Sequence, residues 1–370
     1  MEQRRLPLKA LKALGSGTDR RSLLKSLGAA AVGISFAPVL QACGAEKGEA
    51  NKLNLYSWDT YLGETTLADF KKAEDIDVDL SIFATNDEMY AKMRGSSTVY
   101  DVVVPSNDSV TRLIRTGLLH EIDHAQIPNY KNIGEGYRDV PFDPGRRYSM
   151  PYTWMVMGIG YRKSKVQQVP DSWEYLFASD LYKDKIALVS EPADLMRIAA
   201  KYRGYSVNDI TPERIAALKT MLLKQRPFIK TFHEDNGQDL LLSGDIDVVM
   251  EYNGDVAQIM QNDSDIGFVV PKEGSLLISD SLCIPVNAPH KGNAHRFINY
   301  LLDAEVGKKV SEKILFPTPN DAARALMPAS YKENPVIFPP AELIRKSEYA
   351  VYNATLQPLF DRAVDDIIAA

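Results

Sequence analysis

The chain has 370 residues, of which 45% are hydrophobic and 25% are charged, with 2 cysteines and a formal net charge of -6. This is the composition of a globular protein long enough for two domains, and it excludes a disulfide-stapled scaffold. Residues 1–42 carry a net charge of +5, which leaves -11 on the rest of the chain. So acidic a body argues against a nucleic-acid partner and is compatible with a cationic ligand.

Residues 1–42 have the pattern of an export signal. The pair Arg20–Arg21 precedes an apolar run at 27–40 that is too short to span a bilayer, and the sequence LQAC then ends at Cys43. This order resembles a twin-arginine export signal with a bacterial lipobox, which implies cleavage before Cys43 and a lipid on its thiol. A buried amphipathic helix would not explain the order. We therefore expect an export signal, a lipidated tether at 43–52 and a folded body outside the cytoplasm.

The body alternates strand and helix patterns, which is typical of an α/β fold with largely parallel sheets. Its first part has strands at 53–56, 78–83 and 101–104, with helices at 65–73, 88–93 and 110–115. Its second part has strands at 186–189, 229–232, 248–252 and 267–270, with helices at 195–203, 212–224 and 237–242. Two more helices are predicted at 294–302 and 306–313.

Two segments are predicted to connect the two α/β parts. A long strand pattern at 151–161 could cross from one lobe to the other, and a last strand at 280–286 would return to the first lobe. Cys283 in that strand is expected to be a small buried apolar residue. The resulting division is a first lobe of residues 53–154 with 281–316 and a second lobe of residues 155–280 with 317–370.

The stretch 186–195, IALVSEPADL, gives the first indication of a site. Its four apolar residues predict a buried strand, and Pro192 suits the first turn of a following helix. Glu191 and Asp194 are three residues apart, so they share a face just beyond the carboxyl end of a strand, where open α/β sheets place ligands. Taken alone, acids at a helix start are better explained by the helix dipole.

The same arrangement recurs at other strand edges, and this favours a shared site. Acids, aromatic rings or small polar residues follow four strands or precede a fifth, at Trp58, Asp59 and Tyr61, at Ser106, Asn107 and Asp108, at Glu191 and Asp194, at Tyr252 and Asp255, and at Asp280. None of these positions is Lys or Arg. Gathered carboxylates repel one another, and a polyvalent organic cation would relieve that repulsion while the rings face its ammonium groups.

One motif points to a different class of protein. Residues 120–124, HEIDH, fit the H-E-x-x-H pattern, in which His120 and His124 would bind zinc and Glu121 would be the general base. That chemistry needs a helix through the motif, but Gly117 precedes it and Pro128 follows closely. We therefore favour a chance match and expect no metal, no cofactor and no catalysis, with a zinc hydrolase as the alternative.

Several blocks of the body resemble a known family. They include LYSWDTYL at 55–62, YDVVVPSND at 100–108, VVPKEGSLLISDSLCIPVNA at 269–288 and LFPTPNDAA at 315–323. These blocks resemble the spermidine/putrescine-binding proteins of ABC transporters, which are type II periplasmic binding proteins. The resemblance implies two α/β lobes, each a mixed, mostly parallel sheet flanked by helices, with a hinge of crossing strands and a polyamine between the lobes.

The resemblance also implies a ligand-binding role for nine residues: Trp58, Asp59, Tyr61, Ser106, Glu191, Asp194, Tyr252, Asp255 and Asp280. Three positions depart from the family pattern. Ile278 stands where an aromatic residue is usual, Asp108 replaces a Tyr of the spermidine-type pattern, and Glu234 stands where a small polar residue is usual. These departures leave the preferred amine open.

The implied partners are a polyamine, an ABC permease with its ATPase, and a membrane reached through the N-terminal lipid; a monomer is expected. Two alternatives with the same fold remain. One binds a different amine or an amino-acid-like solute, whose carboxylate would want an Arg that the candidate positions lack. The other is a protein–protein adaptor that has lost the ligand.

Overall fold

The computed structural model describes residues 50–95 and 99–370. The predicted export signal and Cys43 lie outside the described residues. Within the described part, no helix combines the length and the apolar character needed to cross a membrane.

The strands run as follows: β1 (Lys52–Ser57), β2 (Asp77–Ile82), β3 (Val102–Val103), β4 (Ser149–Arg162), β5 (Ile186–Val189), β6 (Ile229–His233), β7 (Val248–Tyr252), β8 (Ile266–Val269), β9 (Leu276–Cys283) and β10 (Glu348–Tyr349). The helices are α1 (Thr66–Glu74), α2 (Asn86–Met93), α3 (Asn107–Arg115), α4 (Glu174–Phe177), α5 (Pro192–Tyr202), α6 (Pro212–Gln225), α7 (Gly237–Ser243), α8 (Asn253–Met260), α9 (Lys291–Leu301), α10 (Ala304–Ile314), α11 (Asp321–Leu326), α12 (Ala329–Lys332), α13 (Ala341–Lys346) and α14 (Gln357–Ile368).

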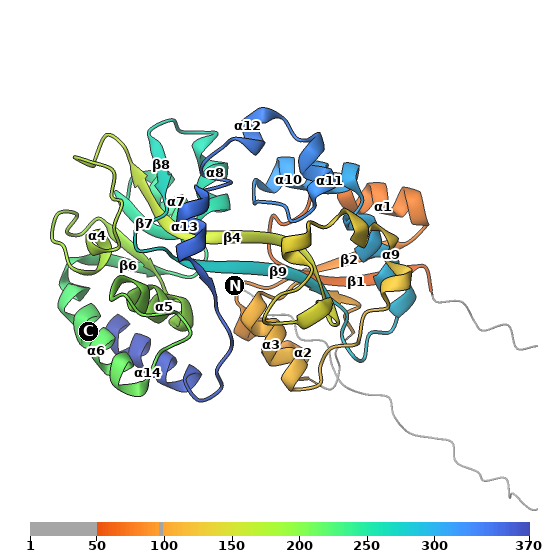
Figure 1. Ribbon diagram of the computed structural model, residues 1–370, viewed down its shortest axis with the longest axis horizontal. Coiled ribbons are helices and arrows are strands. Elements are labelled where there is room, and N and C mark those ends of the chain that lie inside the picture. Colours follow the sequence, from red (N-terminus) through yellow and green to blue (C-terminus); the bar gives the residue numbers. More distant parts are fainter. Residues whose placement is uncertain (1–49, 96–98) are drawn as a thin grey trace, which may run out of the picture. The chain divides into compact units, whose positions relative to one another are not determined.

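The ten strands of the described residues form one sheet path, β2-β1-β3-β9-β4-β7-β5-β6, with β10 beside β9 and β8 beside β4 (Figure 1). Pairing is parallel within each lobe, between β1 and its neighbours β2 and β3 and between β5 and its neighbours β6 and β7. β9 pairs antiparallel with β3, and β4 pairs antiparallel with β7 and β8. β4 and β9 also pair antiparallel with each other. The predicted two-lobed α/β fold is therefore confirmed.

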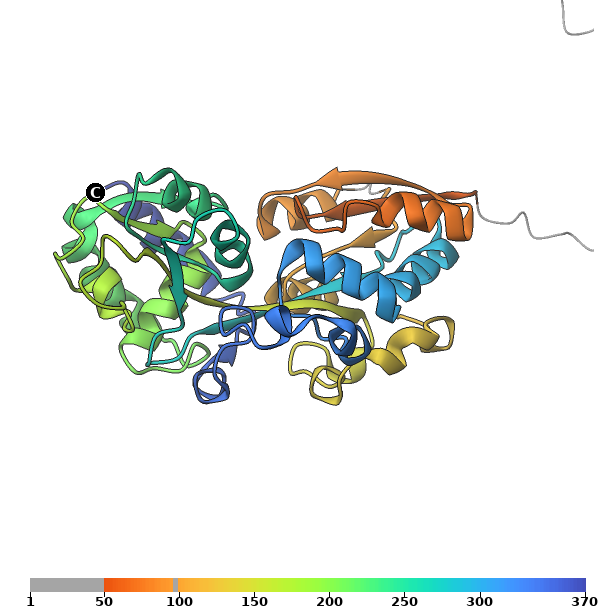
Figure 2. The same ribbon diagram turned by 90° about the horizontal axis from the view of Figure 1, so that it is seen from above.

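Strands β4 and β9 join the two lobes. They pair antiparallel from Ser149–Cys283 to Val156–Leu277, and they lie side by side in both views (Figures 1 and 2). Every residue of β4 except the last is buried, which explains why its sequence is apolar without alternation. At Gly158 a β-carbon would come within 2.3 Å of the Phe268 ring, so only glycine lets β8 pack this closely.

The parallel order within each lobe determines where the site lies. Because β1 and β3 run the same way, the loop after β1 and the start of α3 meet at one edge of the first-lobe sheet. In the second lobe α5 follows β5 and α8 follows β7 in the same manner. Each edge therefore gathers helix N-termini at the carboxyl ends of strands.

The last strand differs from its prediction. β9 is Leu276–Cys283 rather than 280–286, because the apolar residues before Asp280 pair with β4 and the chain leaves the ladder at Pro285, which has no N–H to donate. Asp280 therefore lies inside the crossing strand, not before it. Cys283 is buried with a free thiol, as predicted.

Two further features depart from sequence expectation. The segment 140–148 is rich in Pro, Gly and charged residues, which is typical of a surface loop, yet its Arg146 is fully buried and donates to the Tyr137 carbonyl at 2.8 Å. The helices α4, α8, α11, α12, α13 and α14 and the short strand β10 were not predicted. α14 packs against α5 and α6, so the C-terminal segment completes the helical layer of the second lobe.

Candidate functional site

A cavity of about 690 Å³ lies between the lobes, with its floor on the crossing strands. All nine residues predicted to bind ligand line it: Trp58, Asp59, Tyr61, Ser106, Glu191, Asp194, Tyr252, Asp255 and Asp280. The three positions that depart from the family pattern, Asp108, Glu234 and Ile278, line it as well. Residues from strand edges far apart in the chain therefore surround one cavity.

The first lobe contributes aromatic rings that the protein itself holds in place. The indole of Trp58 donates to the Val104 carbonyl at 2.9 Å and packs on Phe83, with ring centroids 4.4 Å apart. The Tyr61 ring packs edge-on against Tyr152, whose hydroxyl donates to the Tyr61 carbonyl at 2.6 Å. These rings need no ligand to fix their orientation.

Asp280, on β9 at the floor of the cavity, is hydrogen-bonded to the first-lobe wall. Its Oδ2 accepts a short hydrogen bond from the Tyr61 hydroxyl, which also lies 2.7 Å from the Thr153 hydroxyl on β4. The other carboxylate oxygen, Oδ1, is buried without a hydrogen-bond partner in the protein. Burial raises the pKa of Asp280 to about 6, against the opposing effect of the Tyr61 hydroxyl. A buried carboxylate oxygen with no donor suits an ammonium group of a ligand.

The second lobe contributes acids at the starts of its helices. Glu191 is the N-cap residue of α5 and Asp194 lies in its first turn, while Asp255 lies in the first turn of α8. Helix N-termini stabilise nearby carboxylates by about 0.3–1 kcal/mol each. The dipole explanation and the ligand-site explanation are therefore compatible, since the helix starts hold negative charge at the cavity wall.

Crowding and burial disfavour full ionisation of these acids. Burial raises the pKa of Asp194 to about 6, the negative charge of Asp108 acts in the same direction, and Arg197 opposes it. The pKa of Glu191 is raised well above its usual range by burial and then by the charge of Asp194. Burial also raises the pKa of Asp255. A cation placed among these groups would favour their charged forms.

Tyr252 links the acids of the second lobe to its aromatic surface. It is the N-cap residue of α8, and its hydroxyl donates to Asp194 Oδ2 at 2.9 Å. The hydrogen bond orients the carboxylate and leaves the ring on the cavity wall. The sequence placed Tyr252 in the site, but not this contact, which joins two helices.

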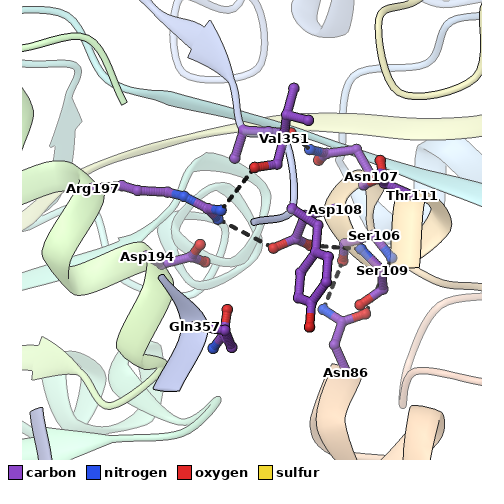
Figure 3. A network of polar contacts seen from close by, with 12 residues as sticks. Asn86, Ser106, Asn107, Asp108, Ser109, Thr111, Asp194, Arg197, Val351 and Gln357 are labelled. Atoms are coloured by element: carbon purple, nitrogen blue, oxygen red, sulfur yellow. Dashed lines mark hydrogen bonds and ion pairs between the residues drawn. The ribbon is translucent and has the colours of Figure 1, made fainter. Parts of the chain in front are cut away.

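Two arginines also line the cavity, although neither is one of the candidate positions. Arg197 of α5 forms an ion pair with Asp108 of α3 at 3.1 Å, and Arg112 of α3 pairs with Asp87 of α2 (Figure 3 shows the first pair). Arg197 is three residues beyond Asp194, so the spacing that linked Glu191 to Asp194 extends to it. Both guanidinium groups already have a carboxylate partner.

Other cavity residues were not among those predicted to bind ligand. They are Asn86 and Asp87 of α2, Asp235 and Asp239 at the start of α7, Phe316 after α10, and Ala350, Tyr352 and Gln357 of the C-terminal segment. The C-terminal segment reaches the cavity because Asn107 of α3 donates to the Ala350 carbonyl at 2.7 Å. No local pattern predicts a contact across more than 200 residues.

In total, ten carboxylates and two guanidinium groups line the cavity. The acids are Asp59, Asp87, Asp108, Glu191, Asp194, Glu234, Asp235, Asp239, Asp255 and Asp280. If all are ionised, the lining has an excess of eight negative charges. Such a surface attracts an organic cation and repels a free anion.

The HEIDH motif does not have the geometry of a zinc helix. Residues 120–123 are not helical, and a single 3-10 turn begins only at His124. His124 Nε2 lies 2.9 Å from the Arg146 carbonyl, and Glu121 forms an ion pair with Arg147. Among residues 50–95 and 99–370, no group of three or more His, Cys, Asp or Glu is arranged to hold a metal ion.

Comparison with known proteins identifies the class. Residues 65–339 match the family of bacterial extracellular solute-binding proteins, so the chain belongs to that family. It is 33% identical over 328 residues to the spermidine/putrescine-binding periplasmic protein of Escherichia coli, covering 88% of this chain and 92% of that protein. It is 31% identical over 322 residues to the putrescine-binding periplasmic protein PotF of Escherichia coli, covering 82% and 87%.

Solved structures show the same fold. A spermidine/putrescine ABC transporter protein from Listeria monocytogenes superposes with a TM-score of 0.82 at 28% identity, covering 86% of this chain and 99% of that one. PotD of Streptococcus pneumoniae gives a TM-score of 0.77 at 27% identity, covering 86% and 98%. The homologues of this chain are thus polyamine-binding components of ABC importers, which are solute-binding transport proteins.

Proposed function

We propose that this protein binds polyamines such as putrescine and spermidine in the interlobe cavity and presents them to an ABC permease and its ATPase. The observation that carries the proposal is the lining of ten carboxylates, whose two guanidinium neighbours are both ion-paired within the protein. Nothing in this wall offers a free positive charge to an anionic solute. The homologues at 31–33% identity are named for the same ligands.

The contacts available can supply useful affinity. Hydrogen bonds to charged groups contribute about 1.5–3 kcal/mol each, and cation–π contacts with Trp58 and Tyr252 about 0.5–2 kcal/mol each. Two carboxylates and two rings would together contribute about 4–10 kcal/mol before the cost of association is subtracted. In this arrangement Asp194 and Asp280 receive the ammonium groups, while the rings cover the carbon chain.

Binding is proposed to close the lobes by a hinge at β4 and β9, because these strands connect the acids of the second lobe to the rings of the first. The protein would act as a monomer and would release its ligand unchanged.

The two arginines of the lining bear on the alternative that the cavity binds an amino-acid-like solute. A carboxylate-bearing solute would need a guanidinium group, and those of Arg112 and Arg197 would have to give up Asp87 and Asp108 first. The Arg197–Asp108 pair is largely buried, and breaking a buried ion pair to form another gains little. The polyamine assignment is therefore the better supported of the two.

Calorimetric titration at pH 7.5 with putrescine, spermidine and ornithine tests the proposal. Ornithine is the control because it adds a carboxylate to the putrescine skeleton. We expect putrescine or spermidine to bind with a micromolar or lower dissociation constant and ornithine to bind at least about a hundredfold more weakly, since its carboxylate meets the acidic wall. Preferred binding of ornithine, or no binding of either amine, would refute the assignment.

We also propose that the chain is exported by its twin-arginine signal and anchored through a lipid on Cys43. The supporting pattern is the Arg20–Arg21 pair, the apolar run and LQAC, in that order. Replacing Cys43 by Ser should release the protein from membranes into the soluble fraction. Replacing both arginines by Lys should retain it in the cytoplasm. Fractionation and intact-mass measurement distinguish these outcomes from an unprocessed N-terminus.

A further inference from the structure

Arg197 lies at one end of the cavity and extends from the second lobe to the first. One of its guanidinium nitrogens is 3.1 Å from Asp108 Oδ2 on α3, and the other is 3.4 Å from the Val351 carbonyl in the C-terminal segment (Figure 3). The side chain of Arg197 is 3% exposed and that of Asp108 is 22% exposed. This is a buried, doubly anchored cation inside an otherwise acidic lining.

The positive charge is confined to one side of the lining. Arg112, the other guanidinium group, lies on α3 like Asp108 and pairs with Asp87. Eight acids of the lining form no ion pair within the described residues: Asp59, Glu191, Asp194, Glu234, Asp235, Asp239, Asp255 and Asp280. Glu191 and Asp194 lie near Arg197, whereas in the described part of the chain no guanidinium group is close enough to Asp255 or Asp280 to affect their ionisation.

A second, smaller cavity of about 300 Å³ lies beyond Arg197. Arg197 and Tyr352 line both cavities, so their side chains stand between the two. The second cavity is lined by Arg115, Arg197, Val207, Asn208, Val351, Tyr352, Asn353, Leu356 and Phe360, and contains no carboxylate. An ammonium group that extended past Asp194 into the second cavity would meet Arg197 and then Arg115, and no carboxylate lines that cavity.

We propose that Arg197 is a specificity-determining residue, whose guanidinium occupies the place of a third ligand ammonium and so makes the cavity select diamines over triamines. This rests on the proposed polyamine function and adds a preference to it. A diamine places both charges between Asp194 and the unpaired acids around Asp255 and Asp280. A triamine must bring its remaining charge against the guanidinium or leave it outside the cavity, and like charges in contact are strongly disfavoured.

The test compares the ratio of the spermidine and putrescine dissociation constants, measured by calorimetry, in the wild type and its variants. Wild-type protein should bind putrescine more tightly than spermidine. In Arg197→Met, which keeps much of the side-chain stem without the charge, the ratio should fall at least about tenfold in favour of spermidine. The double variant Arg197→Met with Asp108→Asn should show the same fall, although the excess of negative charge in its lining is unchanged.

Two control variants distinguish an effect of the position of the positive charge from an effect of the net charge of the lining. Arg112→Met adds the same net negative charge to the lining without opening the end at Arg197, so it should strengthen both amines in proportion and leave their ratio within about threefold of wild type. Arg197→Lys keeps a cation at this end and should retain the preference for putrescine. Thermal melts of all variants confirm that the proteins compared are folded.

Failure of the proposed function and failure of the inference give different results. Absence of any amine binding to the wild type would overturn the proposed function and the inference with it. Amine binding with a wild-type preference for spermidine, or an unchanged ratio in both Arg197→Met variants, would overturn the inference alone. Equal weakening of both amines in Arg197→Met would show that Arg197 only holds the lobes together. Equal shifts of the ratio in Arg197→Met and Arg112→Met would show that net charge alone matters.

Discussion

The two walls of the cavity are built on different principles. The first-lobe wall is aromatic, and hydrogen bonds within the protein fix its rings, as in Trp58 with the Val104 carbonyl and Tyr61 with Asp280. The second-lobe wall is acidic, and burial, reinforced by the charge of neighbouring carboxylates, raises the pKa values of Glu191 and Asp194. The first wall is preorganised for the carbon chain of a ligand, whereas the second is completed only when a cation arrives.

This difference predicts which contacts make ligand affinity depend on pH and which do not. Contacts to a preorganised ring require no change of protonation, so they contribute similarly at every pH between the extremes. Contacts to a carboxyl group with a raised pKa require that the proton leave first. The predictions below test that contrast, from the largest expected effect to the smallest.

Asp194→Ala is expected to have the largest effect. An ammonium group of the ligand would lose its partner inside a closed cleft, and the hydroxyl of Tyr252 would lose its acceptor. Polyamine binding should weaken by about 2–4 kcal/mol, measured by calorimetric titration. The matched control is Asp209→Ala, which removes an exposed carboxylate of the same lobe outside the cavity and should leave affinity unchanged. An unchanged affinity in Asp194→Ala would remove this residue from the site.

Polyamine affinity is expected to fall as the pH is lowered from 7 to 5. In the empty protein the pKa values of Asp194 and Asp280 are raised to about 6, and a bound cation lowers them because it favours the charged carboxylates. Binding free energy is therefore fully present above pH 7 and is lost as the pH falls through 6. Each of the two groups contributes a loss of about tenfold by pH 5, up to about a hundredfold together.

Titrations at pH 5, 6, 7 and 8 measure this dependence, and buffers of different ionisation enthalpy reveal protons released on binding at pH 6. Asp194→Asn should flatten the profile only in part, because it removes one titrating group and leaves Asp280 and Asp235, whose pKa values are also raised to about 6. A profile that is level across this range would show that the carboxylates are already ionised in the empty protein.

Trp58→Ala tests the preorganised wall. Loss of the ring removes a cation–π contact and apolar cover for the carbon chain, so polyamine affinity should fall by about 1–2 kcal/mol. The size of the fall should be the same at pH 7 and at pH 5.5, in contrast to the acids of the second lobe. Trp58→Phe should recover part of the affinity, and a pH-dependent loss would contradict the distinction between the walls.

Asp59→Asn is expected to have the smallest effect. Asp59 is an acid of the first-lobe wall, but its side chain is exposed and makes no ion pair within the described residues. An exposed charge contributes about 1 kcal/mol or less and is screened by salt. The difference between Asp59→Asn and wild type should therefore shrink between 50 mM and 500 mM NaCl. An effect as large as that of Asp194→Ala would mean that the lobes contribute acids of equal weight.

Much of the second-lobe wall could be predicted from local sequence. A short apolar run followed by Glu191, Pro192 and Asp194 specifies a buried strand and a helix start, and parallel strands bring such starts to one edge. The strand β5 has the predicted limits, Ile186–Val189, because four apolar residues bounded by polar ones leave little freedom. Asp280 was found as a residue but misplaced relative to its strand, since periodicity does not fix where a buried strand begins.

The sequence by itself determined the alternation of strands and helices, the acids at the strand edges and the family to which the chain belongs. These features depend on residue type and on short spacings, which are visible without a fold. Only the tertiary structure decided that Arg197 reaches Asp108 across the cavity and that the segment around Ala350 and Gln357 lines it. Such contacts join residues about 90 to 240 positions apart, and only the packing of the two lobes around β4 and β9 sets their distances.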